Sequence, residues 1–286
     1  MSKPTGRIHE TEHHAADRAT TRPVVSGTQG VVSGGHPLVS MAGMRMLLSG
    51  GNAFDAVVAA GFAAAVVEPT ASYTLCGECV ALIHDARARE TLALSGQGTA
   101  PALATVRLFR ERQLDRIPTG PGANAHLSFT VPGAVDAYLT LLETHGTKSV
   151  SEVLAPAVHY AEHGFPMYEY MHGLLAIPET RSQFDIYPPG GTAVFYPGGR
   201  IPEVGELFVQ PALGGTLRRL IEADTKAPIW PDIELGSSRR CERPSRAERS
   251  WGSPHGPRGL CSCRPWACSR RSIYAASATT PPGTST

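Results

Sequence analysis

Two cysteines form a C-x-x-C motif at Cys76 and Cys79, and this spacing could serve redox or metal chemistry. Redox activity requires a thiolate stabilised at a helix N-terminus, and a structural zinc site requires a second pair of ligands at suitable spacing. This pair leads instead into a strand pattern, and no adjacent His or Cys pair completes four ligands. We therefore expect two small buried residues, and redox or metal chemistry is the alternative.

Two carboxylates, Asp55 and Glu68, could act as a general acid and a general base. Asp55 lies in the first turn of a predicted helix, where a negative charge favours the positive end of the helix dipole. Glu68 precedes Pro69 at the end of the same helix. We expect a helix-start charge and a surface carboxylate at the helix end, with an acid/base pair as the alternative.

A glycine-rich turn at residues 95–99 carries further polar candidates after a predicted strand. Ser95, Gln97 and Thr99 alternate there with glycines, which let the backbone come near a ligand or another strand. Gln97 is a candidate contact for a substrate amide. The alternative for Gln97 is an ordinary turn residue.

The elements that position these residues follow from periodicity and from turn residues. A short buried strand is predicted at residues 31–32, and helices are predicted at 37–48 and 53–67. The second helix is apolar on nearly all sides, so we expect it to lie between other layers. Residues 80–84 and 91–94 predict two antiparallel strands. An apolar stripe is expected on the first helix at Leu38, Met41, Met44 and Leu48.

Three later helices are predicted in the middle of the chain. A short one is expected within 103–114, and another opens at Pro132 and ends at Gly146. Ser149 and Glu152 form a capping-box pair for the third. Pro156 is expected to kink or restart that helix, because proline clashes with the preceding turn.

Composition excludes several classes of function. The chain has 286 residues and a formal net charge of +1, so electrostatics gives no reason to expect nucleic acid as a partner. No apolar run reaches the roughly 18 residues that indicate a membrane span. Residues 1–23 are polar and lack the apolar core of a secretory signal, which makes the cytoplasm the default compartment. We expect a mobile tail there and no metal site, although it contains His9, His13 and His14. No cofactor is expected.

Several motifs stand in an order that resembles one protein family. They are H-P-L-V-S-M-A-G at 36–43, G-G-N-A-F-D-A at 50–56 and V-V-E-P at 66–69. Further segments at 129–138, 154–166 and 208–220 extend the match over roughly residues 28–224. The order is similar to that of the gamma-glutamyltransferase family of N-terminal-nucleophile hydrolases, which cut themselves into two subunits. The segment L-C-G-E-C-V-A-L-I-H-D-A at 75–86 resembles the acylase-like branch.

The resemblance implies a fold and a reaction. The fold would be α+β, a four-layer αββα sandwich with antiparallel sheets between helical layers, and the chain would hold only the large-subunit part. Periodicity alone indicates mixed α and β. The reaction would use an N-terminal threonine that attacks an amide carbonyl while its own α-amine serves as the base. The T-T-H or T-H-T type motif of that threonine does not occur in this chain, so we assign no catalytic residue.

The resemblance also places Gln97 and Thr99 on the substrate side. Strict gamma-glutamyl enzymes carry D-G-R-E-T-A-P after the second strand, and its Arg would pair with the substrate α-carboxylate. Here Gln97 takes that position, and Thr99 takes the Arg position of the acylase-like pattern N-G-S-G-R-A-P. Neither residue supplies a guanidinium, so gamma-glutamyl specificity is not expected.

The chain divides into three segments by character. Residues 1–23 are a polar tail, 24–225 are the family-like region, and 226–286 are expected to be disordered because they are rich in Arg, Ser, Pro and Cys and lack valine. We interpret the change as a shift of reading frame or an engineered scar near Thr225, with a natural disordered basic tail as the alternative. Two functions are carried forward. The first is an inactive large-subunit portion of an amidohydrolase that would need a small-subunit portion to act on a small amide or gamma-glutamyl substrate. The second is a non-catalytic binding or regulatory fragment.

Overall fold

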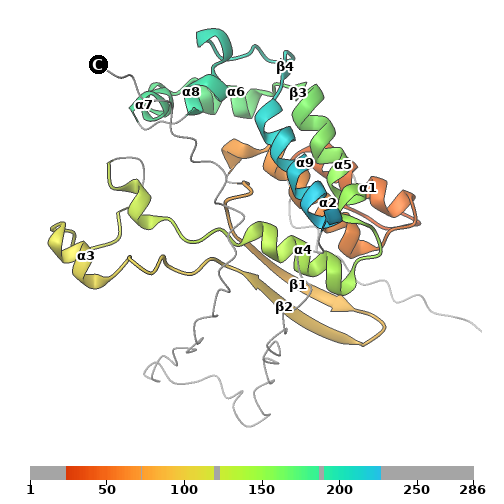
Figure 1. Cartoon of the computed structure of the whole chain (residues 1–286). Coiled ribbons are helices and arrows are strands. Elements are labelled where there is room, and N and C mark those ends of the chain that lie inside the picture. The colour runs from red at the N-terminus through yellow and green to blue at the C-terminus, as the bar shows by residue number, and fades with distance from the viewer. Residues whose placement is uncertain (1–23, 72, 119–122, 187–189, 227–286) are drawn as a thin grey trace, which may run out of the picture. The chain divides into compact units, whose positions relative to one another are not determined.

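The computed structural model describes residues 24–226, apart from 72, 119–122 and 187–189. The described chain is an α+β structure of helices and two small antiparallel sheets (Figure 1). It forms two compact units, the first from residues 24–75 and 138–226 and the second from 76–137. None of the helices in these ranges is long and apolar enough to cross a membrane. The predicted tails, His9, His13 and His14 lie outside the described residues.

The first helix, α1 (Pro37–Leu48), begins and ends where the sequence predicts. Pro37 occupies the first turn, where its missing N–H costs nothing. The backbone N–H of Leu38 donates to Nδ1 of His36, which is the N-cap residue (3.1 Å). Gly50 follows the helix with a positive φ of 83°, a conformation that glycine adopts without a Cβ clash.

The apolar stripe predicted for α1 is wrong. Met41 and Leu48 are 52% and 63% exposed. The buried face is formed instead by smaller or neighbouring residues at the same helical spacing: Val39, Ala42, Gly43 and Met46. The small residues on this face let α1 approach the backbone of the next helix closely. This face is therefore buried, and the face that carries Met41 and Leu48 stays exposed.

The second helix, α2 (Ala53–Val67), lies at the centre of the first unit and packs against α1 and α5 (Val150–His163). Eleven of its 15 residues are buried, which confirms the expectation that it lies between other elements. Its N-terminus is closed by the Asn52 side chain, which accepts from the backbone N–H groups of Phe54 and Asp55. At its other end, the carbonyls of Val66 and Val67 accept hydrogen bonds from the side chains of Gln210 and Tyr168.

The strand predicted at residues 31–32 does not form. The described segment before α1 contains bends and no strand, and Val31 is exposed. A short apolar run becomes a strand only if a partner supplies the ladder of backbone hydrogen bonds, and no described strand pairs with this one.

The helix α5 is the second main packing element of the first unit. This helix begins at a capping box, as predicted, and continues through Pro156 as one element, so the predicted restart does not occur. The buried side of α5 packs against α2 and α9 (Pro211–Lys226). This packing stabilises the helix although Pro156 lacks the N–H for one backbone hydrogen bond. The remaining elements are η1 (Pro69–Ala71), β3 (Phe165–Pro166), α6 (Glu169–Leu175), α7 (Pro178–Ile186), α8 (Gly191–Phe195), η3 (Pro197–Gly199) and β4 (Leu207–Phe208), and β3 pairs with β4.

The second unit contains the predicted hairpin. Strands β1 (Cys79–Asp85) and β2 (Glu90–Gly96) are antiparallel, with Cys79 opposite Gly96 and Asp85 opposite Glu90. Exposed residues alternate with half-buried ones along both strands. The unit also holds α3 (Val106–Glu111), η2 (Ala125–Ser128) and the first turn of α4 (Ala134–His145).

Candidate functional site

The predicted substrate turn lies at the end of β2, and a carboxylate from the start of β1 lies beside it. The Nε2 atom of Gln97 donates to Oε2 of Glu78 (3.3 Å). The hydroxyl of Thr130 donates to the other oxygen, Oε1 (3.0 Å). All three side chains are exposed. The structure therefore joins residues from three separate segments of the second unit through the Glu78 carboxylate.

Backbone hydrogen bonds hold the same three segments together. The N–H of Val131 donates to the carbonyl of Thr99 (2.9 Å). The N–H groups of Gly133 and Ala134 both donate to the carbonyl of Gly77 (3.1 and 3.0 Å). Thr99 thus contributes its backbone carbonyl to this arrangement, and the residue is exposed to solvent. The entry to α4 is fixed against the turn by main-chain contacts that do not depend on side-chain identity.

Two glycines make this approach possible. A Cβ atom on Gly98 would lie 1.7 Å from the carbonyl oxygen of Val131, and one on Gly133 would lie 2.3 Å from the carbonyl oxygen of Gly96. Both contacts are with backbone atoms, which cannot rotate away. The turn is glycine-rich because another stretch of backbone occupies the space of a side chain, as one of the two interpretations from sequence proposed.

The chemistry available at this cluster is polar recognition. Glu78 is a carboxylate acceptor, and Gln97 offers a neutral amide with both a donor and an acceptor group. Sequence reasoning singled out Gln97 and Thr99 as candidates and did not single out Glu78 or Thr130. Glu78 stands between the two cysteines of the C-x-x-C motif, yet Thr130 is 52 residues further along the chain, and no spacing rule links the two.

The cysteines themselves are not buried as predicted. Cys76 is exposed and Cys79 is half-buried, and neither is in a disulfide. Cys79 is the first residue of β1 and Cys76 precedes it, in a unit whose described buried apolar residues are Ala134 and Ala137 at the start of α4. The α4 start lies against this end of the hairpin, but two alanines are too small a core to enclose both cysteines.

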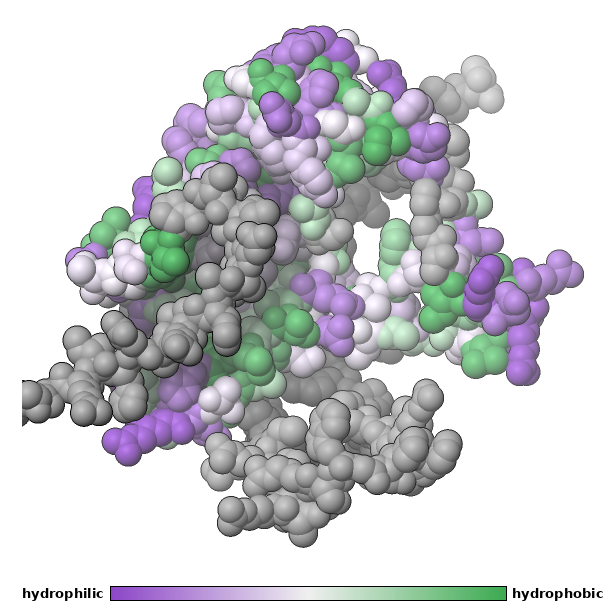
Figure 2. Space-filling view, turned by 180° about the vertical axis from the view of Figure 1, so that it is seen from behind, coloured by the Kyte–Doolittle hydropathy of each residue, from purple (hydrophilic) through white to green (hydrophobic). Residues whose placement is uncertain are grey.

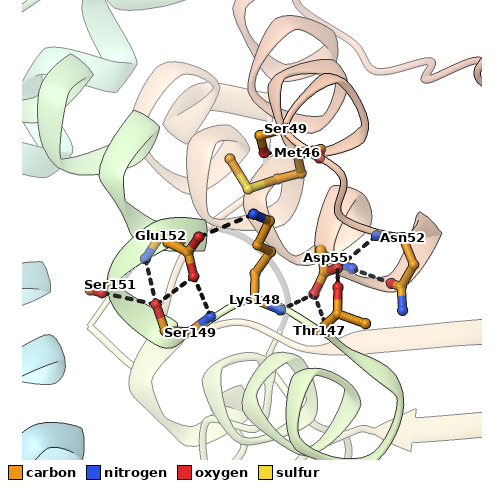
Figure 3. Close-up of polar contacts among 9 residues, drawn as sticks. All are labelled: Met46, Ser49, Asn52, Asp55, Thr147, Lys148, Ser149, Ser151 and Glu152. Carbon is orange, nitrogen blue, oxygen red and sulfur yellow. Dashed lines mark hydrogen bonds and ion pairs between the residues drawn. The ribbon is translucent and has the colours of Figure 1, made fainter.

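Asp55 is a buried structural acceptor at the start of α2. Its side chain is fully buried and accepts from the backbone N–H of Asn52 (2.7 Å). It also accepts from the N–H and hydroxyl of Thr147 (2.8 and 2.7 Å) and from the N–H of Lys148 (3.0 Å). Figure 3 shows the carboxylate between the α2 start and the loop that precedes α5. Burial would raise the pKa of Asp55, but the hydrogen bonds from Thr147, Asn52 and Lys148 lower it below the ordinary value.

Glu68 is buried, which corrects the expectation of a surface carboxylate. It is 6% exposed, and its Oε2 atom has no hydrogen-bond partner among the described residues. Burial raises the pKa of Glu68, and a hydrogen bond from the backbone of His36 partly offsets this effect. The carboxylate lies against the backbone of Gly35, where an added Cβ atom would be 2.2 Å from Oε1 of Glu68.

Asp55 and Glu68 do not form an acid/base pair. They stand near opposite ends of α2, and a helix rises about 1.5 Å per residue, which separates them by roughly 20 Å. The Asp55 oxygens are also occupied by the contacts given above. Among the described residues, Gln97 and Thr99 are exposed and lie in one turn, with the Gln97 side chain bound to Glu78 and the Thr99 carbonyl bound to Val131.

Comparison with known proteins is consistent across sequence and structure. A family model described as gamma-glutamyltranspeptidase matches residues 39–228. The chain is similar to a glutathione hydrolase proenzyme of Bacillus subtilis (strain 168), with 30% identity over 201 residues, which cover 70% of this chain and 33% of the relative. It is 34% identical over 218 residues to the acylase ACY 1 proenzyme of Pseudomonas sp. (strain SE83), covering 73% and 37%.

A solved structure gives the same result. The Helicobacter pylori gamma-glutamyltranspeptidase superposes with a TM-score of 0.64 and 34% sequence identity, over 71% of this chain and 57% of that one. The chain spans about a third of the length of the curated relatives it matches.

Proposed function

Because the chain belongs to the gamma-glutamyltranspeptidase family, we propose that it is the N-terminal, large-subunit portion of an amide hydrolase or acyltransferase. The observation that carries this proposal is the cluster of Glu78, Gln97 and Thr130, which lies within the matched residues 39–228. The two curated relatives are named as a hydrolase and an acylase, which supports amide or acyl chemistry on a small molecule.

The same premise extends to the fold. We propose that residues 24–225 form the family region, flanked by segments 1–23 and 226–286 outside it, and that the described α+β elements are part of a four-layer αββα sandwich. Structural similarity to the Helicobacter pylori enzyme supports this assignment. The partner that would complete the sandwich is a small-subunit portion carrying the strands and the threonine.

The chain by itself is proposed to be inactive. The family reaction requires a threonine hydroxyl that becomes nucleophilic beside its own α-amine, and the chain contains no T-T-H or T-H-T motif. Thr20-Thr21 and Thr279-Thr280 do not stand ahead of an apolar strand, and both pairs lie outside the described residues. Without the attacking atom, positioning groups alone leave the amide bond intact.

A direct assay tests this proposal. The purified full chain is incubated with a gamma-glutamyl anilide, an acyl amide and oxamate, and its mass is followed by intact mass spectrometry. The expected result is no turnover and no self-cleavage. Turnover accompanied by release of a fragment with a new N-terminal threonine would overturn the claim that the nucleophile is missing.

The substrate side is proposed to favour neutral groups over an α-carboxylate. Gln97 stands where strict gamma-glutamyl enzymes are expected to have an Arg, and the Glu78 carboxylate lies 3.3 Å from its amide nitrogen. A substrate carboxylate at this turn would meet a like charge and no guanidinium, which is unfavourable. An amide or hydroxyl group of the substrate can instead hydrogen-bond to Gln97 at no electrostatic cost.

A further inference from the structure

The exposed side of α5 carries two histidines one helical turn apart, and we propose that they form a binding site for a divalent transition-metal ion. His159 and His163 are both exposed, and their rings are stacked with centroids 4.6 Å apart at an interplanar angle of 24°. Residues four apart on a helix project from the same face. A metal ion lies in the ring plane of each imidazole that binds it, so the His159 ring would turn out of the stack on binding. Both imidazoles could then chelate one ion, and solvent could fill its remaining coordination positions.

The hydrogen bonding of His163 prepares it as a ligand. Its Nδ1 atom lies 3.3 Å from the backbone carbonyl oxygen of His159. A carbonyl can only accept, so Nδ1 carries the proton and Nε2 keeps its lone pair for a metal. Metal-binding histidines commonly donate their other ring N–H to a backbone carbonyl in this way, which fixes the tautomer and the ring orientation.

The position of the pair on α5 also favours a cation. His163 is the last residue of the helix, and the unpaired carbonyls of a helix C-terminus attract positive charge. Glu162 lies between the two histidines in sequence, and Arg218 of α9 binds its carboxylate through Nη2 (2.6 Å) and through Nε. Glu162 is therefore already paired with a guanidinium, and we do not count it among the ligands.

The backbone under the site is firmly held. The opposite side of α5 is buried at Ala157, Val158 and Ala161, against the neighbouring helices α2 and α9. The metal would therefore bind a preformed helical turn. Imidazole nitrogen suits Zn²⁺, Ni²⁺ and Cu²⁺, whereas Mg²⁺ and Ca²⁺ prefer oxygen ligands, so the site should discriminate between these two groups of ions.

Hydrogen exchange resolved by peptide mass spectrometry tests the proposal on the full chain, without an added polyhistidine tag. With Ni²⁺ at about ten times its Kd, amides in the last turns of α5 should exchange about tenfold more slowly, because binding stabilises the closed helix by the factor 1 + [L]/Kd. Mg²⁺ at the same concentration should have no effect. Binding of Ni²⁺ to histidines or cysteines elsewhere leaves this peptide unchanged, which keeps the readout local.

The double variant His159→Gln/His163→Gln should lose the Ni²⁺ effect on this peptide. Two matched controls should retain it: His172→Gln, which alters a histidine on another helix, and His13→Gln/His14→Gln, which alters the N-terminal segment. Circular dichroism checks that each variant is helical, and the single variant His163→Gln replaces the double one if helicity is lost. No slowing in the unmodified chain, or equal slowing in the α5 variant, would overturn the proposal.

Discussion

Asp55 is the residue on which the loop between α4 and α5 depends. Its carboxylate satisfies the backbone N–H groups of Asn52, Thr147 and Lys148 and the hydroxyl of Thr147. Asparagine has almost the same shape, but it carries no charge and has only one acceptor oxygen. The loop and the α2 N-terminus would then share one acceptor among several donors.

The variant Asp55→Asn should therefore lower the free energy of unfolding by about 2–3 kcal/mol, because buried donors lose a charged acceptor. Urea denaturation followed by circular dichroism measures the change. Glu143→Gln on the exposed side of α4 is the matched control and should change stability by less than about 0.5 kcal/mol. Equal stability of Asp55→Asn and the unmodified chain would show that the four contacts are dispensable.

Glu68 should respond to pH in the opposite direction to Asp55. The pKa of Asp55 is lowered in the folded chain. The Asp55 carboxylate therefore stabilises the fold at pH values above its unfolded pKa, and this stability is lost as pH falls through the folded pKa. Burial raises the pKa of Glu68. The stability that protonated Glu68 contributes is therefore fully present below its unfolded pKa and is lost as pH rises through its folded pKa.

Replacing Glu68 by Gln removes this titration. We expect Glu68→Gln to gain stability relative to the unmodified chain as pH rises from 4 to 8, by roughly 1 kcal/mol. Urea midpoints measured at several pH values give the difference. A stability difference that does not vary with pH would mean that Glu68 ionises in the folded chain as it does in the unfolded one.

At the proposed substrate turn, Glu78 and Gln97 should be altered together. In Gln97→Arg, the new guanidinium would pair with Glu78, so binding of an α-carboxylate should remain weak. In Glu78→Gln/Gln97→Arg the guanidinium is released, and L-glutamine should bind at least about tenfold more tightly than to the single variant, because a bidentate charged pair is available. Calorimetric titration measures both.

The control ligand for this pair is 4-aminobutanamide, which is L-glutamine without its α-carboxylate. Its affinity should be the same for both variants. If L-glutamine binds equally to the single and double variants, Glu78 does not control carboxylate recognition at this turn.

At the scale of elements, the contact between α1 and α2 relies on small residues. Gly43 of α1 faces α2, and a Cβ atom there would lie 2.9 Å from the backbone carbonyl oxygen of Ala56 and 2.8 Å from the Val32 side chain. The Ala56 carbonyl belongs to the helix backbone and cannot move without shifting α2. The same close approach explains why the larger residues of α1 remain exposed.

The variant Gly43→Ala should therefore destabilise the chain by about 1–3 kcal/mol, the usual cost of overpacking, despite the higher helix propensity of alanine. Thermal unfolding compares it with Gly173→Ala in α6, where nothing lies within 4 Å of the added Cβ. That control should be stabilised by about 0.4–1 kcal/mol. Stabilisation of both variants would mean that the two helices separate easily.

At the scale of the whole molecule, the two units differ in how much apolar surface they bury. The first has a core built from α2, α5 and their neighbours, with Phe62 and Leu154 fully buried. The second leaves large apolar side chains exposed on its hairpin, with Leu82 83% exposed. On the face seen in Figure 2, green apolar residues lie scattered among purple polar ones.

This difference predicts unequal protection from hydrogen exchange. A two-stranded hairpin is marginally stable by itself in water, so amides of β1 and β2 should exchange orders of magnitude faster than those of α2. Mass spectrometry of the full chain measures both in one experiment. Equal protection would mean that the hairpin is covered in solution, and dilution would then distinguish self-association from coverage within one chain.

The sequence by itself determined the elements whose signals are local. Pro37 and Gly50 mark the ends of α1, Asn52 the start of α2, and the Ser149–Glu152 pair the start of α5. Two short runs joined by polar residues predict the β1–β2 hairpin. These features depend on interactions within a few residues, such as caps, turns and helical spacing. The ordered motifs likewise sufficed to identify the family, because they do not require knowledge of contacts.

Only the tertiary structure decided which faces are buried and which distant residues meet. Local pattern could not choose between the two faces of α1, place Glu68 in the interior, or leave residues 31–32 unpaired, since each outcome depends on what lies opposite. Nor could it bring Thr130 to Glu78 across 52 residues. Burial and long-range hydrogen bonds are properties of the packed chain, and no window of neighbouring residues contains them.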